Sequence, residues 1–97
     1  MISEQDYKKH RDMLADKKLE IQELKLAGVE VVDHDSGRGG LVVVLSTEAR
    51  MSSIWALGGR WEVNTRFRDR TVYNSERVVT SLDEAWARAK KWVLDDP

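Results

Sequence analysis

Few residues in this 97-residue chain have the type and spacing that metal or phosphate chemistry requires. Asp33, His34 and Asp35 resemble the start of a metal site, and the two aspartates resemble the first ligands of a calcium loop. The calcium pattern does not continue, because Val44 stands where a bidentate glutamate is needed. The glycine-rich run 37–40 precedes a β-branched segment, whereas a phosphate loop needs a helix N-terminus there. We therefore predict no metal site and no cofactor.

The residues needed for covalent or acid–base catalysis are also scarce. The chain has no cysteine and two histidines, and no serine lies in a nucleophile elbow. His10 falls on the apolar side of a predicted helix, where it is a candidate general base or pH-sensitive contact. The alternative is a partly buried residue at the edge of the core, bonded to Asp6 one turn earlier. The sequence therefore predicts no catalytic residues, and an enzyme is the third-ranked function.

The group of residues that is most informative about function lies around Gly58–Gly59. Two glycines tolerate the positive φ angles of a tight hairpin turn. A two-residue turn sets the register by counting, so that Trp55 lies opposite Glu62. Because side chains alternate between faces, the core face carries the apolar residues Ile54, Ala56, Trp61, Val63 and Phe67. The other face carries Met51, Ser53, Trp55, Leu57, Arg60, Glu62, Asn64, Arg66 and Arg68.

The same count, continued across Asp69–Arg70, places Tyr73 opposite Arg66 and Arg77 opposite Glu62. The predicted partner-binding residues are the aromatic and arginine side chains of this face: Trp55, Arg60, Arg66, Arg68, Tyr73 and Arg77. Aromatic side chains among arginines are typical of protein interaction hot spots, and also of sheets that read nucleic acid. The structural alternative is that the charged residues pair across strands and a helix covers the tryptophan.

These residues are positioned by a predicted sheet between two helices. Ser3 can cap, and Gly28 can end, a long helix over residues 4–27. A capping box at residues 81–84 begins a second helix over 82–94. Runs rich in β-branched and alternating residues predict strands over 29–32, 41–45, 52–57, 60–67 and 71–79. The predicted fold class is α+β, in the order α-β-β-β-β-β-α, with one antiparallel sheet and both helices packed mainly on one face.

Composition narrows the class of protein further. The chain is 41% hydrophobic and 34% charged, which is typical of a globular domain. Its polar beginning and the lack of a long apolar run predict a single soluble, cytoplasmic domain over residues 1–97 with no membrane partner. The formal net charge of −1 argues against a dedicated nucleic-acid binder, whose charge is usually lopsided.

The segment from Gly59 to Ala85 resembles in layout the three-strand-plus-helix DNA-binding modules of some phage integrases. The resemblance is confined to the last third of the chain. It implies DNA contacts from the exposed face of the sheet, made by Arg60, Glu62, Arg66 and Arg68. The order of elements also resembles double-stranded-RNA-binding domains, whose last helix begins with a lysine cluster, whereas this chain has Asp83 and Glu84 there. Neither resemblance assigns the chain to a family.

We therefore expect a small intracellular regulatory protein that acts by contact with a macromolecular partner, in the first place a protein. Its small size is typical of phage or mobile-element accessory proteins. The second-ranked function is nucleic-acid binding through the arginine-bearing sheet face. The first predicted helix carries Tyr7, Leu14 and Ile21 at seven-residue spacing, with Leu19 and Leu26 on another side, and this pattern favours a homodimer.

Overall fold

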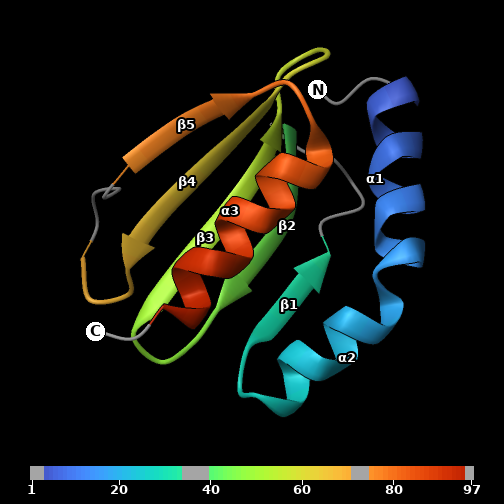
Figure 1. Cartoon of the computed structure of the whole chain (residues 1–97). Coiled ribbons are helices and arrows are strands. Elements are labelled where there is room, and N and C mark those ends of the chain that lie inside the picture. Colours follow the sequence, from blue (N-terminus) through green and yellow to red (C-terminus); the bar gives the residue numbers. More distant parts are fainter. Residues whose placement is uncertain (1–3, 34–39, 71–74, 96–97) are drawn as a thin grey trace.

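The computed structural model describes residues 4–33, 40–70 and 75–95. Within them the elements are α1 (Glu4–Asp16), α2 (Lys18–Leu26), β1 (Glu30–Asp33), β2 (Leu41–Ser46), β3 (Arg50–Ala56), β4 (Trp61–Phe67), β5 (Ser75–Val79) and α3 (Leu82–Leu94). The strands form one antiparallel sheet in the order β1-β2-β3-β4-β5, so each strand pairs with its neighbour in sequence. The helices pack on one face of the sheet (Figure 1), which confirms the predicted α+β fold.

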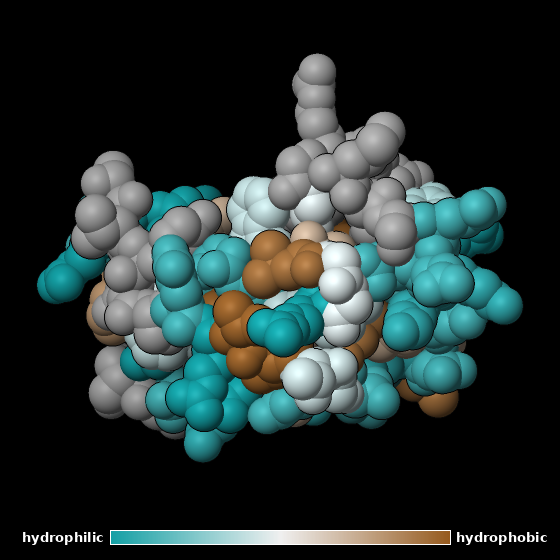
Figure 2. Space-filling model, turned by 90° about the horizontal axis from the view of Figure 1, so that it is seen from above, coloured by the Kyte–Doolittle hydropathy of each residue, from teal (hydrophilic) through white to brown (hydrophobic). Residues whose placement is uncertain are grey.

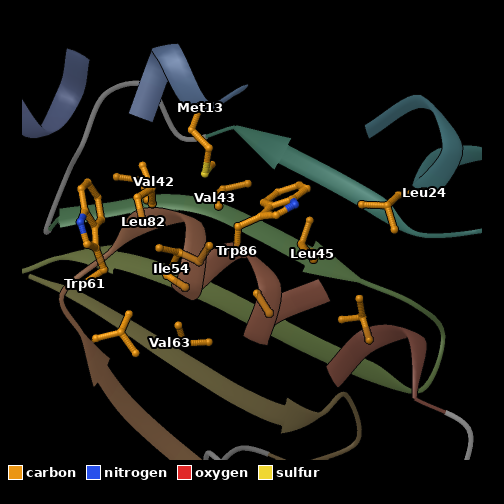
Figure 3. Close-up of a cluster of buried hydrophobic side chains, with 14 of the residues drawn as sticks. Met13, Leu24, Val42, Val43, Leu45, Ile54, Trp61, Val63, Leu82 and Trp86 are labelled. Carbon is orange, nitrogen blue, oxygen red and sulfur yellow. The ribbon is translucent and has the colours of Figure 1, made fainter. Parts of the chain in front are cut away.

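The C-terminal helix, α3, has the predicted bounds and the predicted N-cap. Ser81 Oγ accepts a hydrogen bond from the backbone N–H of Glu84 at 3.3 Å, as a capping residue should. The apolar stripe of α3 faces the sheet and is buried, comprising Leu82, Ala85, Trp86, Ala89 and Val93. Figure 3 shows Trp86 at the centre of the core, among side chains from the sheet that include Ile54 and Leu45. This stripe fixes α3 across the middle strands of the sheet (Figure 1).

The single long helix predicted for residues 4–27 was wrong, because the structure divides it into α1 and α2. Lys17 separates them with φ −100° and ψ 18°, outside helical geometry. Hydrogen bonds still run from Lys17 N to Met13 O (3.0 Å) and from Ile21 N to Lys17 O (2.8 Å), so the junction is a bend. The bend lets each helix bury its own contact, Met13 from α1 and Leu24 from α2. The predicted cap Ser3 lies outside the described residues, whereas Gly28 has the positive φ of +91° expected after a helix end.

The register predicted for the β3–β4 hairpin is confirmed. Gly58 and Gly59 both have positive φ angles, 66° and 91°, and Trp55 pairs with Glu62. The register predicted for β4 and β5 was wrong by one residue, because Glu62 pairs with Val78 instead of Arg77. β4 ends at Phe67, and residues 71–74, which precede β5, lie outside the described residues. Since one residue of register exchanges the two faces of a strand, Arg77 lies on the helix-bearing face.

No described helix is long and apolar enough to cross a membrane.

Apolar side chains are exposed at the end of the molecule where β3 and β4 are joined. Leu57, at that hairpin, is 46% exposed. Figure 2 views the molecule from this end and shows apolar side chains gathered within a border of polar ones.

Candidate functional site

The candidate site is the sheet face turned away from the helices, which we term the open face. None of the described helices covers it (Figure 1). By the strand pairing, its residues are Glu30, Val32, Val44, Ser46, Met51, Ser53, Trp55, Leu57, Glu62, Asn64, Arg66, Glu76 and Val78. Val78 is 49% exposed there, whereas Ile54 on the helix-bearing face is fully buried. The open face therefore combines exposed apolar side chains with charged ones.

Trp55 lies at the centre of the open face and is half-buried. Its indole Nε1 donates a hydrogen bond to Ser53 Oγ at 2.9 Å, so the ring lies back along its own strand. Ser53 pairs across the strands with Asn64, and both side chains are buried beneath their larger neighbours. The alternative in which a helix covers Trp55 is not met by the described helices, which all lie on the other face.

Asn64 adds an unusual polar feature to this face. Its side chain is 4% exposed, and its Oδ1 accepts no hydrogen bond from any described residue. A buried carbonyl without a donor costs about 1–3 kcal/mol.

A hollow of about 160 Å³ lies directly over these residues. Its lining combines apolar, polar and cationic side chains from β2, β3 and β4: Val44, Met51, Ser53, Trp55, Asn64 and Arg66. Its size suits one side chain of a partner rather than a cofactor, since small-molecule sites usually exceed about 300 Å³.

The predicted arginines do not converge on this hollow. Arg66 borders it, but its guanidinium donates to the carbonyl of Arg70 at 2.6 Å and to the sulfur of Met51 at 2.9 Å. Arg68 donates to the carbonyl of Thr47 at 3.1 Å, at the far end of the strands from Gly58. Arg60 is exposed beside the hairpin glycines, at the opposite end. Of the predicted set, the structure brings together Trp55 and Arg66 alone within the described residues.

Two other predicted members fall elsewhere. Arg77 lies on the helix-bearing face, opposite Val63. Tyr73 lies outside the described residues. Conversely, Val44 and Val78 belong to the open face but were not selected from the sequence. The register of β1, β2 and β3 was not counted, and the register of β4 and β5 was counted wrongly by one residue. The pairing of β2 with β3 shifts between Leu41 and Val43, and nothing in the local sequence announces this bulge.

The buried histidine has a structural partner. His10 is fully buried, and its Nε2 lies 2.6 Å from Asp33 Oδ1 at the end of β1. This contact ties α1 to the sheet. No group of three or more metal-ligating side chains gathers among residues 4–33, 40–70 and 75–95. His34 and Asp35 lie outside the described residues.

A charged contact joins α2 to α3. Lys90 donates a hydrogen bond to the Glu20 carboxylate, and Lys17 lies between Glu20 (4.0 Å) and Asp83 (3.6 Å). The Lys90 ammonium holds the pKa of Glu20 below its ordinary value, against the opposing effect of burial.

The outer side of α2 carries two exposed leucines. Leu19 is 75% exposed and Leu26 is 90% exposed. These leucines form a second apolar surface, which the predicted homodimer would use to contact a second copy of the chain.

Comparison of the chain with protein-family models, with curated proteins and with solved structures finds no match. Function is therefore argued from the open face itself.

Proposed function

We propose that the protein binds another protein through the open face, with Trp55 as the central anchor. The observation that carries this proposal is the hollow beside Trp55, which is lined by apolar, polar and cationic side chains from three strands. A partner side chain seated there would bury the indole together with Met51 and Val44. Aromatic anchors in central recesses dominate the affinity of many protein interfaces.

The charges of the open face favour a protein over a nucleic acid. Three carboxylates lie on it, those of Glu30, Glu62 and Glu76, against the guanidinium of Arg66. Phosphate groups would be repelled by these carboxylates, and Arg66 already donates to a backbone carbonyl and a thioether. A fitting partner surface is apolar at its centre and basic at its rim. We infer that this contact serves a regulatory role inside the cell.

Affinity capture with matched variants tests the proposal. Trp55→Ala removes the anchor, whereas Leu94→Ala removes an apolar side chain that is 48% exposed at the end of α3. Lysates are passed over wild type and both variants, with and without nuclease. We expect a protein that wild type and Leu94→Ala retain after nuclease treatment. Trp55→Ala should bind it about 30-fold more weakly, the equivalent of about 2 kcal/mol.

Two results would contradict the proposal. Equal retention by Trp55→Ala and Leu94→Ala would mean that the open face is not the contact surface. Loss of every retained protein after nuclease treatment would mean that nucleic acid bridges the contact, as the second-ranked function requires.

A further inference from the structure

A second recess lies on the helix-bearing face, over β4 and between α3 and β5. It is a cleft of about 430 Å³, and small-molecule sites usually span about 300–1,000 Å³. Its lining includes Val63 and Thr65 from β4, Arg77 from β5, and Arg88, Lys91 and Trp92 from α3. The cleft is separate from the open face, since the sheet lies between them (Figure 1).

The floor and one wall of the cleft are apolar and rigid. Val63 is 2% exposed on the helix-bearing face of β4. Trp92 is half-buried in the α3 wall, and its Nε1 donates to the carbonyl of Arg66 at 3.2 Å. The guanidinium of Arg50 lies 4.6 Å from the centre of the same ring. These contacts fix the indole in place, so the cleft offers a preformed apolar surface to a ligand.

The rim of the cleft is cationic. Arg77 and Lys91 are exposed, and neither has a carboxylate within ion-pair distance among the described residues. Arg88 adds a third cation, which reaches Glu84 at 3.4 Å along α3. The C-terminal end of a helix favours a cation such as Lys91, but this effect does not account for Arg77 on the facing strand. The rim therefore gathers like charges from two elements.

Two carboxylates also border the cleft, but they are directed elsewhere. Asp95 lies 3.7 Å from the guanidinium of Arg50. Glu76 pairs with Asn64, so its side chain belongs to the open face. Neither carboxylate lies within ion-pair distance of any of the three cations of the rim. These cations are therefore accessible to an anion from solution.

We propose that this cleft binds a small organic phosphate, a phosphate monoester that carries an apolar body. The phosphate group contacts Arg77, Arg88 and Lys91, and the apolar body lies over Val63 against the Trp92 ring. A phosphate monoester carries about −1.5 to −2 charges at neutral pH, so it balances the two unpaired cations better than a single carboxylate does. The planar fork of arginine also matches phosphate oxygens. This inference does not depend on the proposed function of the open face.

The probe is phenyl phosphate, titrated into the whole chain at physiological ionic strength and followed in nuclear magnetic resonance spectra. We expect saturable shifts of the Trp92 indole N–H and of the backbone amides that line the cleft. Inorganic phosphate lacks the apolar body and benzoate carries less charge, so each should bind at least about fivefold more weakly. Benzylamine keeps the ring but reverses the charge, and it should not bind.

Matched variants locate the site. The double variant Arg77→Gln/Lys91→Gln should weaken phenyl phosphate binding by about tenfold or more. Both residues are exposed, so the fold should persist, which the amide spectrum of the variant verifies. Arg68→Gln, which removes an exposed charge outside the cleft, and Trp55→Ala on the open face should leave binding unchanged.

Several results would overturn the proposal. One is the absence of saturable shifts by tens of millimolar phenyl phosphate, and another is equal binding by a folded double variant. Equal affinity for inorganic and phenyl phosphate would show that surface charge alone attracts the ion, without the apolar floor. An oligothymidylate that binds more tightly than phenyl phosphate through the same two residues would assign the rim to nucleic acid instead.

Discussion

Arg50 offers the sharpest test of how α3 is held on the sheet. The residue is 7% exposed, and its guanidinium lies 5.4 Å from the ring centre of Phe67 and 4.6 Å from that of Trp92. It also donates to the carbonyl of Trp92 at 3.3 Å, in the last turn of α3, and lies 3.7 Å from Asp95. Arg50→Met retains the apolar stem and removes the charge. It should therefore isolate the electrostatic part of this contact.

The magnitude follows from these contacts. Cation–π contacts of a desolvated guanidinium are worth about 1–2 kcal/mol, and a charged hydrogen bond to a helix C-terminus about 1.5 kcal/mol. The methionine avoids part of the desolvation cost of the guanidinium, so we expect a net loss of about 2–3 kcal/mol. For a domain of this size that loss lowers the melting temperature by about 10–20 °C. Urea unfolding, followed by circular dichroism, measures the change.

Two variants make the result interpretable. Arg68→Met removes an exposed arginine that also donates to a backbone carbonyl, and it should change stability by less than about 0.5 kcal/mol. Arg50→Lys should fall between the two, because an ammonium keeps the charge but loses the planar stacking surface. If Arg50→Met unfolds at the same urea concentration as wild type, the contact does not fasten α3 and the reasoning fails.

The remaining predictions concern the turns and the helix contacts. Gly40→Ala should destabilise by about 2–4 kcal/mol, since its Cβ would lie 2.7 Å from the Ala56 carbonyl oxygen and its φ is +86°. Gly28 has a similar φ of +91° but open space around it, so Gly28→Ala should lower the free energy of unfolding by only about 1–2 kcal/mol in thermal melts. Equal losses for the two variants would rule out the close approach at Gly40. Glu20 has a lowered pKa, so its contact with Lys90 stabilises the fold fully above pH 4.5, the ordinary pKa of the carboxyl group. This stabilisation weakens as the pH falls through the lower pKa of the folded state. Glu20→Gln should therefore lose stability relative to wild type near neutral pH and less below pH 4.5; a difference independent of pH would contradict this.

The sequence predicted best those elements whose signals are local. The capping box at Ser81 and the apolar stripe behind it define α3 without reference to the rest of the chain. Gly58 and Gly59 likewise fix both a turn type and a register, because their positive φ angles suit one kind of two-residue hairpin. These two signals were sufficient to place Trp55 on the face opposite the core.

The remaining features depend on tertiary contacts that no local pattern reports. The bend at Lys17 occurs in a segment without glycine or proline, where two different packing surfaces compete for one helix. Arg77 changed faces because β4 and β5 pair one residue away from the register counted across the predicted turn. Arg50 was not expected in the core at all, since a buried guanidinium becomes favourable only when α3 brings Trp92 and its C-terminal carbonyls beside it.

Residue-specific crosslinking tests the role of the open face most directly. A photoreactive benzoylphenylalanine is placed at Val32 or Val78, on opposite edges of the open face, or at Leu94 on α3. These positions are comparably exposed, at 36%, 49% and 48%. If the open face binds a protein, irradiation in cell extract should join the same nuclease-resistant partner to both open-face positions and not to position 94. A partner joined at position 94 as efficiently as at 32 and 78, or no shared product from the two open-face positions, would contradict that role.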